Sequence, residues 1–218
     1  MAILLGILRP LHWLLDRLLA ACRALSIALL ALMVAAILLQ VVMRYVFGAA
    51  LAWPEEAARF GMLWLVGLMA PVAYRRGGFV AIDMAERALP PRAGAALVLG
   101  LLIVSLAVIL YMLPLAARHV ASGCLFTSSS LWTPFDLALA LPLPGPLDLT
   151  LCTKGAPAFG LTWGWTKVPL AAMYASLYVG LQLLVLVNVE LVLRNLVALL
   201  GEGTRLPEIR VTDMASAE

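Results

Sequence analysis

Charged residues are scarce in this sequence of 218 residues: Asp, Glu, Lys and Arg make up 12% of it, and hydrophobic residues 64%. Soluble domains carry about 25% charged and about 45–50% apolar residues. A larger core cannot explain the difference, because a chain of this size leaves much of its surface in contact with solvent. The shortage of charge excludes an ordinary soluble domain and predicts a membrane protein. The Lys and Arg residues are scattered at the ends of apolar runs, so the net charge of +3 does not indicate nucleic acid as a partner.

Histidine is also rare, and the sequence has no recognisable catalytic motif. His12 and His119 are its two histidines. A haem-carrying membrane anchor needs axial ligands at membrane depth, and these two residues fall at opposite predicted faces of the membrane. We find no Ser-His-Asp set, no H-E-x-x-H and no metal-ligand spacing. We therefore expect no enzyme activity, no cofactor and no bound metal.

Four long uncharged runs predict the membrane-spanning helices. A helix needs about 20 apolar residues to cross a hydrocarbon core about 30 Å thick. The second run has only fifteen uncharged residues, between Arg59 and Arg75, so this span must include a turn at its ends. The sequence predicts an all-α membrane protein with four transmembrane helices at residues 24–47, 55–75, 93–117 and 168–190.

Residues 1–22 have the pattern of an amphipathic helix that lies in the membrane interface. Arg9, His12, Asp16 and Arg23 fall within about 60° of one another at about 100° per residue. A cleaved signal peptide is disfavoured, because no basic residue precedes the first apolar stretch and the run after Arg23 exceeds a typical signal core. We predict a second, short interfacial helix at residues 79–90 and a tail at 201–218.

The distribution of Lys and Arg predicts the orientation. Ten of these residues belong to the N-terminus, the second loop and the C-terminus, and five to the first and third loops. The positive-inside rule then places both termini in the cytoplasm of a bacterial cell, with the chain in its inner membrane.

The third loop, residues 122–166, is long for a connection and is expected to be periplasmic. It contains Cys124 and Cys152, and in an oxidising compartment we expect these to form a disulfide, which would contribute roughly 3–4 kcal/mol of chain entropy. The alternative is two unrelated apolar cysteines, and a non-reducing mass map that finds both thiols free would establish it. Pro142, Pro144 and Pro146 exclude a spanning helix in the apolar stretch 137–147, which favours a periplasmic lid or an interfacial hairpin.

A charged turn before the second span forms the first motif, Arg44–Arg59. Arg44 and Tyr45 end the first span, and Trp53 belongs to the aromatic belt. Glu55 and Glu56 follow Pro54 at the positive end of a helix dipole, with Arg59 close enough to pair with Glu56. The two carboxylates could form a cation or proton site, but helix capping and a subunit interface are favoured.

The second motif covers residues 75–92. Arg75 and Arg76 close the second span where they can meet lipid phosphates. Asp83 lies off the apolar face of the short interfacial helix, and Pro90 and Pro91 end it. Phospholipids are therefore expected partners.

These motifs, in this order, resemble the small membrane subunit of TRAP (tripartite ATP-independent periplasmic) transporters, the DctQ-like or Q component. The matching letters are RYVF at 44–47, WPEE at 53–56, RRG at 75–77, ID at 82–83 and PPR at 90–92. Residues 156–161 and the entry to the fourth span also resemble the family. The resemblance covers about residues 20–122 and 155–200, and the stretch near 124–154 looks like an insertion.

The resemblance implies a passive role beside a large membrane subunit. That subunit carries the substrate and sodium sites and moves as an elevator, while a periplasmic substrate-binding protein delivers an organic anion. The small subunit would brace the large one. The alternatives are the small subunit of a tricarboxylate-type tripartite transporter and a non-transport membrane anchor subunit.

Overall fold

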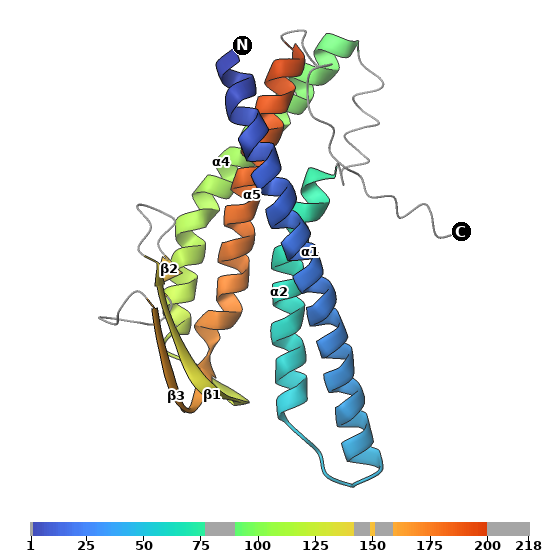
Figure 1. The fold of residues 1–218 in the computed structure, drawn as a ribbon, viewed down its shortest axis with the longest axis vertical. Helices are drawn as coiled ribbons and strands as arrows, with labels where there is room; N and C mark the ends of the chain where they lie inside the picture. Colours follow the sequence, from blue (N-terminus) through green and yellow to red (C-terminus); the bar gives the residue numbers. More distant parts are fainter. Residues whose placement is uncertain (1, 77–89, 142–148, 151–158, 200–218) are drawn as a thin grey trace.

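A computed structural model describes residues 2–76, 90–141, 149–150 and 159–199. Within these residues, four long helices form most of the structure: α1 (Ala2–Tyr45), α2 (Trp53–Arg75), α4 (Pro91–Gly123) and α5 (Leu170–Leu199). Each contains a segment that is long and apolar enough to cross a membrane. The prediction of four spans is therefore confirmed, and the chain is a multi-pass membrane protein (Figure 1).

The helices pack in the spatial order α1, α2, α5, α4. α2 contacts both α1 and α5, and α5 contacts α4. Figure 1 shows the two pairs, α1 with α2 and α4 with α5. Leu68, Val72, Leu183 and Val187 form part of the core between α2 and α5. The central position of α5 agrees with its having the largest buried share among the four spans.

Two glycines let α2 and α5 approach each other closely. A Cβ atom added to Gly67 would lie 2.5 Å from the carbonyl oxygen of Ser176, and one added to Gly180 would lie 2.7 Å from the carbonyl oxygen of Gly67. Small residues permit such backbone contact between membrane helices. Any larger side chain at Gly67 must push the two central helices apart.

The predicted break between an N-terminal interfacial helix and the first span is absent, because α1 is continuous over 44 residues. No Gly or Pro occurs between Pro10 and Gly48, so nothing in the sequence ends the helix earlier. At about 1.5 Å per residue α1 is about 66 Å long, roughly twice the hydrocarbon thickness. Gly48, three residues after the end of α1, adopts a φ of 65°, a conformation that favours glycine.

The all-α prediction is wrong for the third loop, which contains an antiparallel sheet. β1 (Thr127–Leu141) pairs with β3 (Phe159–Pro169) and, at its end, with β2 (Leu149–Thr150), in the order β2-β1-β3. Both long strands contain Thr, Trp and Phe, residues that favour strands. The three prolines of residues 142–148, residues 79–89 of the predicted interfacial helix and the tail at 201–218 lie outside the described residues.

Candidate functional site

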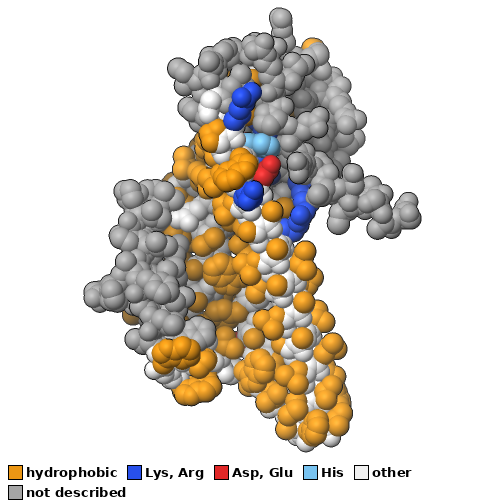
Figure 2. Space-filling view, in the orientation of Figure 1, with side chains coloured by type: hydrophobic (Ala, Val, Ile, Leu, Met, Phe, Trp, Pro, Cys, Tyr) orange, Lys and Arg blue, Asp and Glu red, His pale blue; other side chains and the backbone are white. Residues whose placement is uncertain are grey.

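Five side chains from three helices form a largely buried group that we call the ion cluster: His12, Asp16, Arg75, Glu190 and Arg194. α1 supplies the first two, α2 supplies Arg75 and α5 supplies the last two. In Figure 2 basic, acidic and histidine side chains meet in the upper part of the visible face, above a mainly hydrophobic lower part. The cluster joins both helix pairs at one end of the bundle.

The ion pair of Arg75 and Glu190 lies at the centre of the ion cluster. The Arg75 Nε–H group donates to Glu190 Oε2 at 2.6 Å, and a terminal N–H group donates to Glu190 Oε1 at 2.9 Å. This two-point geometry is the strong form of an Arg–carboxylate contact. Arg75 also donates to Asp16, and the Glu190 side chain has no exposed surface. Each buried charge therefore has a partner of opposite sign, as burial requires.

His12 and Arg194 complete the ion cluster. Nδ1 of His12 lies 2.9 Å from Glu190 Oε1, and its Nε2 lies 3.3 Å from Asp16 Oδ2. Arg194 donates from Nε to Glu190 Oε1 at 3.1 Å, one helical turn further along α5. The two carboxylates balance the formal charges of the two guanidinium groups, so the charged side chains of the cluster compensate one another.

The position of the ion cluster along the helices matches one edge of a membrane. Leu170 and Glu190 are twenty residues apart on α5, and Trp53 and Arg75 twenty-two residues apart on α2. At about 1.5 Å per residue these distances are about 30 and 33 Å, close to one hydrocarbon thickness. The polar stripe of His12 and Asp16 was predicted to face lipid headgroups, but the structure turns it toward α2 and α5.

A second buried polar group lies beside the ion cluster and reaches α4. The side-chain amide of Asn188 donates to Tyr74 Oη at 2.6 Å and to Ser105 Oγ at 3.1 Å. Tyr74 Oη and Ser105 Oγ are themselves 3.2 Å apart. This group connects α2, α4 and α5, so all four helices are tied by polar contacts at the same end of the bundle.

At the other end of the bundle, Glu56 connects α2 to the sheet. Its carboxylate accepts from the backbone N–H groups of Ser129 and Ser130 at 3.1 and 2.8 Å, and from the Ser130 hydroxyl at 2.6 Å. The sequence predicted that Arg59 would pair with Glu56. Arg59 instead pairs with Glu55 at 2.5 Å, because residues four apart also face each other on a helix.

The remaining residues of the first motif are exposed. The guanidinium carbon of Arg44 lies 6.0 Å from the Tyr45 ring centroid, and Tyr45 is 78% exposed. Trp53 begins α2 and is 39% exposed.

The structure describes only part of the second motif. Arg76 caps the other end of α2, where its backbone N–H donates to the Ala73 carbonyl. Asp83 lies outside the described residues.

The three cysteines differ in their surroundings. Cys22 is a buried free thiol on α1. Cys124 follows the last turn of α4 and is disulfide-bonded. Cys152 lies outside the described residues, so the Cys124–Cys152 pairing itself stays a prediction.

Sequence reasoning did not foresee three polar features of the structure. The ion pair of Glu190 and Arg194 was missed, because both residues were read only as marking the end of a span. A carboxylate and a guanidinium four residues apart at a membrane edge indicate such a pair. The serines after α4 were not predicted to bind any group, but Ser129 and Ser130 hold the Glu56 carboxylate. Gln182, in the middle of α5, was overlooked, and its buried Nε2 atom has no hydrogen-bond partner within the described residues.

Four apolar helices, with their charges confined to the two ends, define a membrane-integral protein without a catalytic constellation among the described residues. The family model described as "Tripartite ATP-independent periplasmic transporters, DctQ component" matches residues 33–144. The chain therefore belongs to the DctQ family, the small Q subunits of TRAP transporters, which is a family of transporter subunits and not of enzymes. No curated protein and no solved structure matches the chain.

The matched range can be read on the structure. It begins in the second half of α1, includes α2 and α4, and ends just after β1. It thus covers the Glu56 contact and Arg75 but neither His12 nor Glu190. The range includes residues 124–144, part of the stretch that the sequence suggested as an insertion, and that insertion stays a prediction.

Proposed function

We propose that this chain braces the large, elevator-type membrane subunit of a TRAP transporter that takes up an organic anion with sodium coupling. A periplasmic binding protein would deliver the anion, and the chain would lie in the bacterial inner membrane with both termini cytoplasmic. Membership of the DctQ family is the observation that carries this proposal.

The distribution of charge within the helices supports a bracing role. No Asp, Glu, Lys or Arg occurs in residues 24–43, 60–74, 93–117 or 170–189. Ionisable groups inside a membrane usually mark ion or substrate paths. The described charges near the ends of the spans are largely committed to partners in the same chain, as in the ion cluster. The geometry favours a rigid support over a transport path.

The outer helices supply the surfaces that can contact a partner. α1 exposes Val34 and α4 exposes Val104, each among other large apolar side chains. At the end with the first motif, Arg44, Tyr45, Trp53, Glu55 and Arg59 are at least partly exposed. We propose that the large subunit covers one of these two helix faces and that lipid covers the other. The exposed residues of the first motif then lie at the subunit or lipid boundary.

Co-purification and transport can test the proposal together. The tagged chain is co-expressed with the large membrane subunit, and the complex is reconstituted in vesicles with the binding protein and a sodium gradient. We expect the large subunit to co-purify and uptake of an organic anion to need the small subunit. Purification of the chain without a large subunit, or equal uptake when the chain is omitted, would contradict the bracing role.

Two matched variants identify the face in contact. Val34→Trp and Val104→Trp each add bulk to an exposed apolar position on α1 or α4. Only the variant on the contact face should lower the amount of large subunit retained, while both keep the same unfolding midpoint. Full retention in both variants would show that neither α1 nor α4 provides the contact face at these positions.

A further inference from the structure

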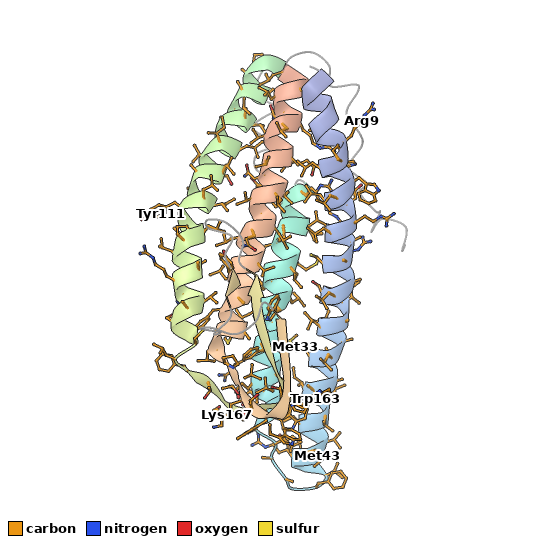
Figure 3. All side chains as sticks on the ribbon, turned by 60° about the vertical axis from the view of Figure 1, so that its left-hand side comes forward. Arg9, Met33, Met43, Tyr111, Trp163 and Lys167 are labelled. Atoms are coloured by element: carbon orange, nitrogen blue, oxygen red, sulfur yellow. The ribbon has the colours of Figure 1, made fainter. Side chains whose placement is uncertain are left out.

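An apolar groove runs between α1 and α2, in the half of the bundle nearer the hairpin of β1 and β3. It lies between residues 29–39 of α1 and 53–64 of α2, with Leu131 of β1 at its side, and has a volume of about 450 Å³. We call it the α1–α2 groove. Figure 3 shows Met33, one of its lining residues, above Met43 at the lower end of α1. None of the lining residues carries a charge, so the groove suits an apolar ligand.

Short side chains on both helices leave this space open. Ala36 of α1 and Ala57 and Gly61 of α2 line the groove. A Cβ atom added to Gly61 would lie 3.9 Å from the Met33 Cβ, which is an ordinary contact. At Gly67, in contrast, an added Cβ would lie 2.5 Å from a backbone oxygen of α5. α2 therefore packs tightly against α5 and leaves room for a further apolar group beside α1.

The length of the α1–α2 groove matches one leaflet of a bilayer. Its lining residues Leu29 and Leu39 are ten residues apart on α1, and Trp53 and Trp64 are eleven apart on α2. At about 1.5 Å per residue the groove is about 15–16 Å long, which is half of a hydrocarbon core about 30 Å thick. Because Trp53 begins α2, the groove runs from one edge of the membrane to about its middle.

The volume of the α1–α2 groove distinguishes an acyl chain from a helix as its occupant. A helix is about 10–12 Å across with its side chains, so a segment about 15 Å long occupies roughly 1,200–1,700 Å³. That volume is several times the volume of the groove. An acyl chain is thinner and flexible, and acyl chains are the solvent at this depth. A chain in the groove also gives the lining atoms dispersion contacts that an empty space lacks.

Two tryptophans mark the ends of the α1–α2 groove. Trp53 lies at the membrane edge, where an indole N–H can donate to the ester carbonyl of a phospholipid. Trp64 lies at the other end, and its Nε1–H group donates to the Ala172 carbonyl of α5 at 3.0 Å. This hydrogen bond holds the Trp64 ring in place as the wall at which the groove ends.

We propose that the α1–α2 groove binds one acyl chain of a phospholipid from the leaflet at the hairpin end, with the ester groups beside Trp53 and the chain directed toward Trp64. The bound chain fills the space between the first two spans. Val34 lies about 160° from both Leu32 and Ala36 at about 100° per residue, so the groove faces away from that exposed side of α1. The proposal concerns the chain and lipid alone, and it does not depend on the transport partners.

Retention of lipid tests the proposal on the full chain. The protein is reconstituted in vesicles of phosphatidylethanolamine and phosphatidylglycerol, extracted in mild detergent and washed, and native mass spectrometry then counts the phospholipids that stay bound. We expect one phospholipid per chain. Gly61→Leu should retain several-fold less, because its side chain fills the groove, whereas Gly100→Leu, with open space at its Cβ on α4, is the matched control and should retain as much as the unmodified chain. No retained lipid in the unmodified chain, or equal retention in the two variants, would overturn the proposal.

Photolabelling of the unmodified chain gives a second measurement that needs no folded variant. The probe is phosphatidylglycerol with a diazirine in the middle of one acyl chain, and the sample is irradiated after the same detergent wash. We expect adducts on residues 29–39 and 57–64 to be several-fold more frequent than adducts around the exposed Val104 of α4. Equal labelling of α4 would show that the lipid is not bound at one site. Loss of the groove adducts when the large membrane subunit is co-expressed would mean that protein occupies the groove, and either result would overturn the proposal.

Discussion

The ion cluster predicts a strong energetic coupling between Arg75 and Glu190. Both side chains are almost fully buried, and two hydrogen bonds connect them. Removing one partner from a buried pair costs about 3–5 kcal/mol, because the other charge is left without compensation. Replacing both partners with apolar residues of similar volume is often close to neutral. We therefore expect Arg75→Leu and Glu190→Leu each to be severely destabilising and the double variant to be much less so than their sum.

The size of the coupling follows from what each single variant leaves behind. In Glu190→Leu, Arg75 keeps its contact with Asp16, whereas in Arg75→Leu the Glu190 carboxylate keeps Arg194 and His12. These remaining contacts reduce the cost, so we expect a coupling energy of about 2–3 kcal/mol, at the upper end of values for contacting residues. Unfolding of the four proteins in mild detergent, measured by circular dichroism against added SDS, gives the coupling from one double-mutant cycle.

The exposed pair of Glu55 and Arg59 is the control for this cycle. The Glu55 side chain is 60% exposed and the Arg59 side chain 70%, and the two residues are four apart on α2. Exposed pairs of this kind contribute about 0.5 kcal/mol or less. A coupling between Arg75 and Glu190 no larger than that of the control pair would refute the reasoning, since it would mean that the buried charges do not depend on each other.

Two further predictions concern the helix contact and the sheet. Gly67→Val should destabilise the bundle by about 1–3 kcal/mol or more, because its Cβ would meet the backbone of Ser176. Gly100→Ala is the control: it has open space at its Cβ and should change the unfolding midpoint little. Equal midpoints for both variants would contradict the close packing of α2 and α5. Glu56→Gln should release the start of β1 and make the hairpin several-fold more sensitive to limited proteolysis, because charge-assisted hydrogen bonds are about twice as strong as neutral ones. Glu55→Gln is its control, and an unchanged cleavage rate in Glu56→Gln would show that the serine contacts do not fix the hairpin.

The number and approximate limits of the spans could be predicted from sequence, because membrane thickness sets the length of an uncharged run. The short second run was a correct guide: α2 ends at Arg75 and begins at Trp53, so it includes the charged turn at its start. The continuity of α1 was harder to predict from the sequence. The pattern changes from amphipathic to apolar near Arg23, and such a change is compatible with either a break or one continuous helix. The absence of Gly and Pro between Pro10 and Gly48 was the signal for a single helix.

The ion cluster could be predicted only in part. The spacing of His12 and Asp16 showed a polar stripe, but helical periodicity cannot tell whether such a stripe faces headgroups or another helix. Arg75 and Glu190 are 115 residues apart, and only the packing of α2 against α5 brings them together. The same limit applies to Glu56, whose partners in the sheet are more than seventy residues away.

The two ends of the bundle are fixed by different means, and the difference bears on what the protein can do. At one end, ion pairs and the Asn188 group connect all four helices, so relative sliding of α1, α2 and α5 would separate buried charges at a cost of several kcal/mol. At the other end, a single carboxylate, Glu56, and the junctions with α4 and α5 hold the hairpin. Small adjustments are therefore cheaper at the hairpin end than at the ion cluster. If the chain braces a moving partner, the ion cluster is the fixed end, and the hairpin end is the part that can adjust.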